Sequence, residues 1–320
     1  MFLRWLKPHG DPPLPLRSHL GLGLQGGGVH GAFAWGVLDR LLEEPRFAPV
    51  AISGASAGAL NAAVLAAGLA EGGRDGAKAA LAALWSGVAD MAFLKLLGTP
   101  GAYLHLDLMT RLISPYQFNP LNINPLRDLL TGLIDFERLR RLRPVTLFLS
   151  ATNVRTGASR IFREDEVSVD VLLASSCLPY LHHPVEIEGD SYWDGGFSAN
   201  PPLLPLALDT ACRSLLLVKL TPDNEATVPV TAQPIATRMK RLLFNAPLLR
   251  DLEALARMQA RLRQSRWLVR GLVRLRDLDL AAITITSALM DPDIRPTDLI
   301  GHLHAAGRLA AEDMLASQGI

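Results

Sequence analysis

The sequence is poor in cysteine and in net charge. Its 320 residues include two cysteines, and 32 Lys and Arg against 31 Asp and Glu leave a net charge of +1. Two thiols, Cys177 and Cys212, are too few for a disulfide framework, so we expect both to be reduced. The balanced charge gives no overall attraction to nucleic acid, and we expect no such partner.

The sequence also lacks a long apolar run. No stretch reaches 18 apolar residues, and the Ala-rich stretch 59–70 is shorter and contains Asn61. The apolar part of residues 1–7 is too short for a signal peptide and leads into proline-rich sequence. We therefore expect a cytoplasmic protein that is at most peripheral to a membrane.

Metal-ligand spacing is missing as well. His182 and His183 are adjacent, so in an extended segment their rings point to opposite sides and chelate poorly. No other His, Cys or carboxylate residues cluster with ligand spacing. We expect neither a metal nor a cofactor.

The most informative pattern that is present is the pentapeptide Gly54-Ala55-Ser56-Ala57-Gly58. It follows a β-type run and precedes an Ala- and Leu-rich stretch, 57–68, that predicts a helix. A serine on such a sharp turn projects its hydroxyl outward, while Gly54 and Gly58 permit the tight turn. The N–H groups at the helix start favour negative charge nearby. Ser56 is therefore a candidate nucleophile for acyl transfer.

A glycine cluster, Gly26-Gly27-Gly28, lies upstream between a predicted strand, 20–25, and a predicted helix, 32–43. Consecutive glycines can turn their N–H groups into one concave surface that holds a phosphate or an oxyanion. The spacing Gly21-x-Gly23-x-x-Gly26 also matches the dinucleotide-binding fingerprint. Its first two glycines fall inside the predicted strand, which disfavours that interpretation.

A third pattern follows a predicted hairpin with arms at 185–187 and 191–193. The second arm ends at Asp194, and Gly195, Gly196 and then Asn200 come next. Taken alone, an Asp-Gly pair is typical of an ordinary turn.

Together the three patterns resemble the patatin-like phospholipase family of serine hydrolases. That family has a Gly-rich oxyanion loop, a G-x-S-x-G elbow and an Asp-Gly-Gly followed by Asn and Pro. All three occur here in order, within residues 18–220. The resemblance implies that Ser56 is the nucleophile and Asp194 its base, in a dyad without histidine. It also implies an oxyanion hole formed by the backbone N–H groups of Gly26, Gly27 and Gly28.

One position departs from the family pattern. The family commonly has Arg or Lys before the last glycine of the loop, where this chain has His30. A histidine near its reference pKa of about 6.5 is only partly charged at neutral pH. His30 either supports an anionic head group or only packs against the loop, so phospholipids and neutral esters are both candidate substrates.

Strand-like runs alternate with helix-like runs, which predicts a mostly parallel sheet with helices on both faces. Together with the resemblance, this predicts the α/β class and a patatin-like three-layer α/β/α sandwich. We divide the chain into an N-terminal extension, 1–17, a catalytic domain, 18–230, and a mostly helical C-terminal part, 231–320, packed on the core. Residues 91–124 predict either a lid or acyl-pocket wall, or a packed insertion.

The C-terminal part contains a basic stretch, with 11 Lys and Arg against 2 Asp and Glu in residues 236–276. Four apolar residues share one side of a predicted helix: Leu252, Leu255, Met258 and Leu262. A change of phase predicts a break near Arg263. The basic helices at 250–276 either make a peripheral contact with anionic lipid or pack on the core with a solvated basic face.

These inferences predict a serine acyl hydrolase that cleaves carboxylic esters of lipids, as a phospholipase A or lysophospholipase does, through an acyl-Ser56 intermediate. A transacylase and a polyhydroxyalkanoate-type polyester depolymerase could use the same dyad. An α/β-hydrolase triad would need His302 or His304, which lie in a predicted helix rather than a loop. A non-catalytic lipid-binding protein of the same fold is the remaining alternative. The sequence makes no prediction of the oligomeric state.

Overall fold

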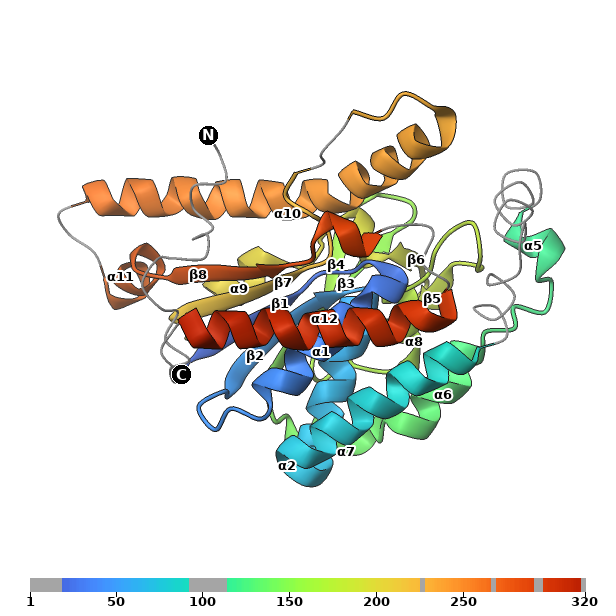
Figure 1. Cartoon of the computed structure of the whole chain (residues 1–320), viewed down its shortest axis with the longest axis horizontal. Helices are drawn as coiled ribbons and strands as arrows, with labels where there is room; N and C mark the ends of the chain where they lie inside the picture. Colours follow the sequence, from blue (N-terminus) through green and yellow to red (C-terminus); the bar gives the residue numbers. More distant parts are fainter. Residues whose placement is uncertain (1–18, 92–113, 225–227, 266–268, 291–295, 318–320) are drawn as a thin grey trace.

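The computed structural model describes residues 19–91, 114–224, 228–265, 269–290 and 296–317. An eight-stranded sheet runs through its centre in the order β5-β6-β3-β2-β1-β7-β8, and β4 also pairs with β3 (Figure 1). The strands are β1 (Leu20–Leu24), β2 (Pro49–Ala55), β3 (Thr146–Asn153), β4 (Ser159–Arg163), β5 (Val185–Ile187), β6 (Asp190–Asp194), β7 (Ser214–Lys219) and β8 (Asp279–Thr284).

The sheet is mostly parallel. Strands β3, β2, β1, β7 and β8 pair with one another in parallel. The antiparallel part lies at one edge, where β4 and β6 pair with β3 and β5 forms a hairpin with β6. The predicted α/β class is confirmed, because helical segments connect the parallel strands and cover both faces of the sheet.

The longer helices follow in chain order. They are α1 (Gly31–Leu41), α2 (Ala57–Asp90), α6 (Pro125–Leu133), α7 (Phe136–Leu142), α8 (Val169–Ser175), α9 (Leu203–Leu208), α10 (Ala232–Gln264), α11 (Arg270–Arg276) and α12 (Pro296–Ser317). A four-residue helix, α5 (Pro115–Phe118), and three 3-10 turns, η2 (Gly28–His30), η3 (Gly195–Phe197) and η4 (Ser287–Met290), complete the described elements. The backbone of α2 leaves helical geometry only at Gly72 and Gly73.

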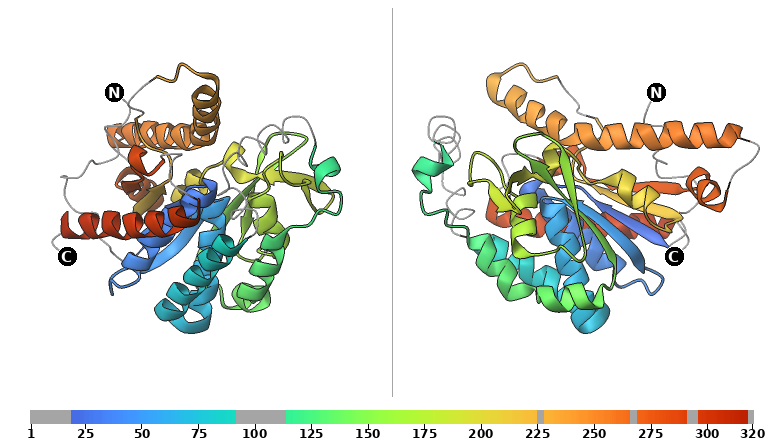
Figure 2. Two further views of the ribbon diagram at one scale, coloured as in Figure 1. Left: turned by 45° about the vertical axis from the view of Figure 1, so that its right-hand side comes forward. Right: turned by 180° about the vertical axis from the view of Figure 1, so that it is seen from behind.

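Two apolar clusters lie on opposite faces of the sheet, as alternation along β7 shows. Leu216 and Val218 belong to the cluster formed with α1, α2 and α12. Leu215 and Leu217 belong to the cluster formed with α9, α10 and α11. Successive strand residues point to opposite faces, so the sheet is the middle layer of three (Figure 2).

The C-terminal part contributes to the sheet and to its helical cover. Strand β8 pairs in parallel with β7. Helix α12 crosses α1 at two glycines, where the backbones approach closely. A Cβ added to Gly36 would lie 2.0 Å from the His304 carbonyl oxygen, and one added to Gly307 would lie 2.1 Å from that of Phe33. The predicted division at residue 230 therefore cuts through one sheet, and it stays a prediction.

Two predictions fall largely outside the described residues. The N-terminal extension, 1–17, lies there entirely, and so does 92–113 of the predicted insertion. Within its remaining residues, the Tyr116 ring stacks on His183 with a centroid distance of 4.0 Å. In the part of the chain that is described, no helix combines the length and the apolar character needed to cross a bilayer.

Candidate active site

Ser56 lies on a sharp turn between the end of β2 at Ala55 and the start of α2 at Ala57. Its backbone has φ 53° and ψ −127°, a conformation that non-glycine residues rarely adopt. The flanking glycines make this turn sterically possible. A Cβ on Gly54 would lie 2.5 Å from the Gly58 carbonyl oxygen, and one on Gly58 would lie 2.0 Å from that of Leu24. The turn thus holds the Ser56 side chain at the carboxyl edge of the parallel strands.

The backbone of Ser56 is also fixed from a second element. Its N–H donates to the Ser175 hydroxyl oxygen at 3.0 Å, and both residues are buried. Ser175 is the last residue of α8. The sequence analysis assigned no role to Ser175.

Asp194 ends β6 next to this turn, and its side chain is fully buried. One carboxyl oxygen, Oδ1, accepts a hydrogen bond from the Gly196 N–H at 2.7 Å. The other, Oδ2, has no completed hydrogen bond among the described residues. The Ser56 hydroxyl nevertheless lies close enough to affect the titration of this carboxyl. The two side chains are therefore neighbours that do not complete a hydrogen bond in this structure, and catalytic hydrogen bonds often form fully only when substrate binds.

The pKa of Asp194 is raised to about 7. Burial is the main cause, because it disfavours the charged form, while the Ser56 hydroxyl and the Gly196 N–H partly oppose it. A carboxyl that titrates near neutral pH can both accept and return a proton under ordinary conditions. The arrangement therefore supplies a base beside a hydroxyl without histidine.

The glycine loop approaches Ser56 directly. A Cβ on Gly26 would lie 2.8 Å from the Ser56 Cβ. The Gly26 N–H is already used, however, because it donates to the Asn200 side-chain oxygen at 2.6 Å. The N–H groups of Gly27 and Gly28 donate to no described protein group. Of the three predicted oxyanion-hole donors, the Gly26 N–H is thus occupied by Asn200 in this structure, and a role for Gly27 and Gly28 stays a prediction.

His30 contacts the same loop from its C-terminal end. Its Nδ1 lies 3.3 Å from the Gly27 carbonyl oxygen, where an N–H at Nδ1 donates. Burial lowers the pKa of His30, the contact with Gly27 opposes this, and the nearby Arg241 of α10 lowers it further. A neutral His30 therefore fixes the loop, and the cation close to it comes from α10.

Two residues that the sequence analysis left without a role hold the loops in place. Asn200 accepts from Gly26 and donates to the Phe244 carbonyl oxygen at 2.9 Å. Gln25 accepts from the Leu220 N–H at 2.7 Å. The Asn of the Asp-Gly-Gly pattern was a usable signal for Asn200, whereas Gln25 had none.

Gly195 and Gly196 sit where a side chain has no room. A Cβ on Gly195 would lie 2.1 Å from the Ser150 carbonyl oxygen, and one on Gly196 would lie 2.4 Å from the Phe244 ring. The Thr152 hydroxyl donates to the Asp194 carbonyl oxygen at 2.7 Å. These contacts explain why two glycines must follow the aspartate.

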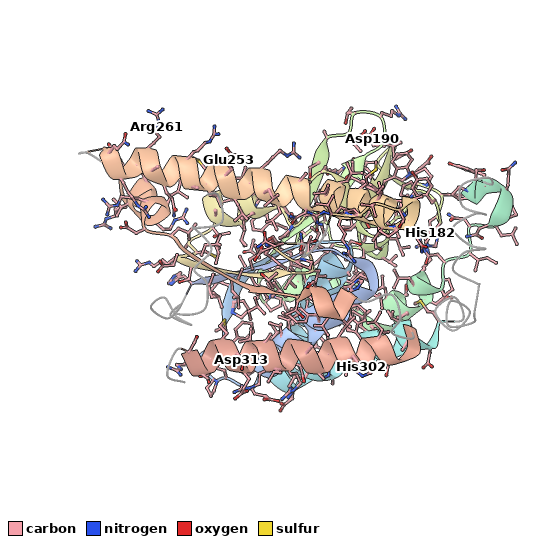
Figure 3. The ribbon with its side chains drawn as sticks, turned by 45° about the horizontal axis from the view of Figure 1, so that its top comes forward. His182, Asp190, Glu253, Arg261, His302 and Asp313 are labelled. Atoms are coloured by element: carbon pink, nitrogen blue, oxygen red, sulfur yellow. The ribbon has the colours of Figure 1, made fainter. Side chains whose placement is uncertain are left out.

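The histidines of the alternative triad lie on α12. The His304 ring stacks on Trp35 at 3.8 Å, and its Nε2 lies 3.2 Å from the Asp39 carboxyl. The contact is with α1, away from Ser56. His302 is on the same helix, as Figure 3 shows. His304 is therefore engaged by α1, and the choice between dyad and triad stays a prediction.

Comparison with known proteins gives one family and several similar solved structures, among them VipD and ExoU. Residues 22–207 match the family described as patatin-like phospholipase. No curated protein matches the chain. The crystal structure of VipD from Legionella pneumophila is similar with a TM-score of 0.44 and 17% identity, over 94% of this chain and 67% of VipD. That of the type III effector protein ExoU is similar with a TM-score of 0.38 and 18% identity, over 96% of this chain and 54% of ExoU.

Proposed function

Because the chain belongs to the patatin-like phospholipase family, we propose that it is a serine acyl hydrolase that cleaves carboxylic ester bonds of lipids. The observation that carries the proposal is the buried Asp194 carboxyl. One of its oxygens is fixed by Gly196 and the other has no completed hydrogen bond among the described residues, and the Ser56 hydroxyl is close by. A lipid hydrolase is what the family assignment supports in general; the dyad and the substrate are our proposal.

In the first step, the Ser56 oxygen attacks the ester carbonyl carbon while its proton moves to Asp194 Oδ2. The carbonyl oxygen becomes an oxyanion. It takes up hydrogen bonds from the N–H groups of Gly27 and Gly28 and the favourable dipole at the start of α2. Collapse of this intermediate breaks the bond to the alcohol, which leaves with the proton from Asp194. The product of this half-reaction is an acyl-Ser56 ester.

In the second step, water attacks the acyl-Ser56 carbonyl carbon and gives a proton to Asp194. Collapse releases the fatty acid and returns the proton to the Ser56 oxygen, which restores the starting state. An alcohol in place of water would make the same cycle a transacylation. A polyester chain could also enter it, since each of its links is a carboxylic ester.

Labelling and turnover together test the proposal. A fluorophosphonate probe should label the wild type and should not label Ser56→Ala. Hydrolysis of p-nitrophenyl esters of increasing chain length should be lost in both Ser56→Ala and Asp194→Asn, with His302→Ala/His304→Ala as the control that retains it.

Two results would overturn the dyad. One is full turnover by Asp194→Asn, and the other is a loss of turnover of about a thousandfold in the double histidine variant. A folded wild type that neither reacts with the probe nor hydrolyses any ester would instead support a non-catalytic lipid-binding protein.

A further inference from the structure

Helix α10 has two halves that meet at Pro247. Figures 1 and 2 show that the helix changes direction between them. A proline inside a helix removes one backbone N–H and kinks the chain. We call residues 232–246 the first half and residues 247–264 the second half.

The apolar side of the second half packs against the protein core. Leu248 and Leu255 are buried in the second apolar cluster, and Leu252, Met258 and Leu262 pack against it. The side that faces outward carries charged residues, among them Glu253 and Arg261 (Figure 3). One large apolar side chain of this half, Leu249, is exposed, at 44%, so this half lacks a continuous apolar face for insertion into a lipid surface.

The first half presents apolar side chains to solvent instead. Ile235 is 40% exposed, Met239 58%, Leu242 49% and Leu243 58%. On a helix with about 3.6 residues per turn these four side chains fall within an arc of roughly 100°. We call these four residues the apolar arc. Exposed large apolar side chains gathered on one helix face mark an interaction surface more often than isolated ones do.

The charged residues in the sequence segment that contains the apolar arc have one sign. Residues 231–250 contain Arg238, Lys240, Arg241 and Arg250 and no Asp or Glu. At helical spacing, Arg238 and Lys240 flank the apolar arc on its two sides. Arg241 falls on the opposite side, in agreement with its effect on His30. An apolar stripe bordered by cations is complementary to a surface that is apolar inside and anionic outside.

The first half is joined to the catalytic loops at its C-terminal end. The Phe244 ring packs on Phe197 at a centroid distance of 4.7 Å and fills the space over Gly196. The Asn245 side chain accepts a hydrogen bond from Gln25 at 3.1 Å. A surface that binds the apolar arc is therefore held next to the loops that carry Asp194 and the glycine N–H groups.

We infer that the apolar arc of α10 docks on an anionic phospholipid surface and holds the active site against it. The inference rests on the proposed function, because a lipid ester in a bilayer must be reached from the bilayer surface. Docking inserts the four apolar side chains among the acyl chains near the head groups, while Arg238 and Lys240 stay at the phosphate level. The inference thus places the membrane contact at 235–243, and the contact predicted through 250–276 stays a prediction.

Vesicle binding by the 320-residue chain tests this inference. The Ser56→Ala chain is used, so that the vesicle lipids are not hydrolysed during the measurement. Binding is measured by co-sedimentation with vesicles of phosphatidylcholine containing a minor fraction of phosphatidylglycerol, and with vesicles of phosphatidylcholine alone. We expect binding to the anionic vesicles, and a decrease of about tenfold or more in Met239→Glu/Leu243→Glu.

Two controls accompany this variant. Leu309→Glu makes the same change at a leucine on α12 whose side chain is 64% exposed. This variant should bind the vesicles as the parent does. Arg257→Glu/Arg261→Glu reverses two charges on the outer side of the second half and should lower binding much less than the change in the apolar arc. Circular dichroism and thermal denaturation of each variant establish that it is folded.

Several outcomes would overturn the inference. These are unchanged binding by the folded Met239→Glu/Leu243→Glu variant, equal binding to neutral and anionic vesicles, or loss of binding only in the Arg257→Glu/Arg261→Glu variant. A wild-type dimer in sedimentation equilibrium that becomes a monomer in Met239→Glu/Leu243→Glu, without vesicle binding, would assign the apolar arc to a second copy of the chain. Hydrolysis of short soluble esters by the wild type is measured separately, so that a failed inference is not mistaken for a failed active site.

Discussion

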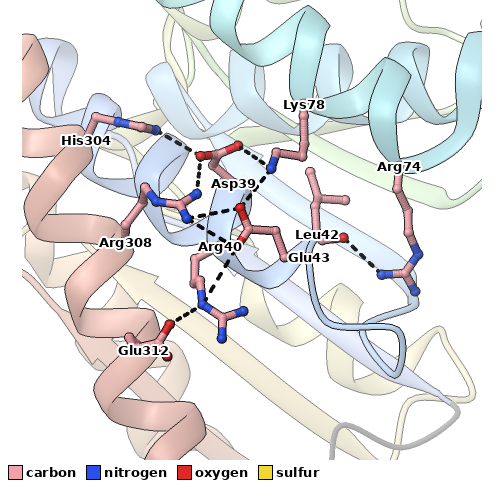
Figure 4. Close-up of polar contacts among 9 residues, drawn as sticks. All are labelled: Asp39, Arg40, Leu42, Glu43, Arg74, Lys78, His304, Arg308 and Glu312. Carbon is pink, nitrogen blue, oxygen red and sulfur yellow. Dashed lines mark hydrogen bonds and ion pairs between the residues drawn. The ribbon is translucent and has the colours of Figure 1, made fainter.

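Asp39 and Asp194 are two poorly exposed carboxylates in opposite surroundings. Asp39, on α1, contacts Lys78 of α2 at 3.5 Å and His304 of α12 at 3.2 Å, and it also pairs with Arg308 (Figure 4). Asp194 has no salt bridge to any described residue, and its side-chain hydrogen bond comes from the neutral Gly196 N–H. One carboxylate holds three helices together, and the other is kept without a cation.

The ion pairs of Asp39 stabilise the fold, whereas the absence of a cation beside Asp194 among the described residues suits its carboxyl to proton transfer. Around Asp39, Glu43 adds contacts to Lys78 at 2.9 Å and to Arg308 at 3.0 Å, so that positive and negative groups alternate along the α1–α12 contact. Around Asp194, the lack of a cation leaves burial as the dominant influence and raises the pKa of its carboxyl to about 7. Such a carboxyl destabilises the fold when ionised, but it can take a proton from a hydroxyl.

The largest expected effect comes from neutralising Asp194, the carboxylate that we propose as the base. Asp194→Asn should lower kcat/KM by about 10³-fold or more, because the amide cannot accept the Ser56 proton. It should also raise the free energy of unfolding at pH 8 by roughly 2–4 kcal/mol, because the cost of burying the charge disappears. Urea denaturation and ester hydrolysis of one preparation measure both quantities. A variant that is less stable than the wild type at pH 8 would contradict this account of Asp194.

The opposite result is expected at the other carboxylate. Asp39→Ala should lower the free energy of unfolding by about 2 kcal/mol, because Lys78, His304 and Arg308 lose a shared partner in a partly buried contact. Turnover per folded molecule should stay at the wild-type level, since the residue lies in the α1–α12 contact. The comparison fails if Asp39→Ala retains its full stability, or if its folded fraction is inactive.

The pH dependence sharpens the comparison further. With Asp194 titrating near pH 7, kcat/KM should fall by about tenfold per unit as the pH drops below 7, and level off above it. Its raised pKa also makes the folded state bind more protons than the unfolded state between the two pKa values, so this group lowers stability as pH rises from about 4 to 7.

Glu43 acts in the other direction, because the contacts with Lys78 and Arg308 lower the pKa of its carboxyl. Its contribution to stability is present above the pKa of unfolded glutamate and is lost as pH falls through the lower folded value. Activity should therefore be lost at a higher pH than the α1–α12 contact. Rate profiles and thermal denaturation across the acid range check this order, and simultaneous loss of both would contradict it.

The smallest effect is expected at the edge of the charged contact. Glu312 pairs with Arg40, but its side chain is 55% exposed. Glu312→Gln should change the free energy of unfolding by less than about 0.5 kcal/mol, since water competes for exposed ion pairs. Urea denaturation of Glu312→Gln and Asp39→Ala, side by side, measures the two changes in the free energy of unfolding. An equal decrease in the two variants would mean that burial does not determine how much each ion pair stabilises the fold.

The sequence predicted the parts of the site that depend on local geometry. The turn at Ser56 follows from two glycines with no room for a side chain, and Asp194 could be found because its glycines follow at once. The use of the Gly26 N–H by Asn200 could not be predicted, because the two residues are 174 positions apart. Periodicity also placed the apolar side of the second half of α10 correctly, since the core covers it. Helical spacing alone could not show that the apolar residues of the first half remain uncovered.

The glycine crossing of α1 and α12 has a consequence for the synthesis of the chain. Gly36 and Gly307 bring the two helices together from nearly opposite ends of the sequence. At a ribosomal rate of about 5–20 residues per second, α1 leaves the ribosome on the order of 10–50 s before the helix that covers it. During that interval the face of α1 that α12 contacts has no native cover. The nascent chain therefore offers a binding site to molecular chaperones well before the enzyme can be complete.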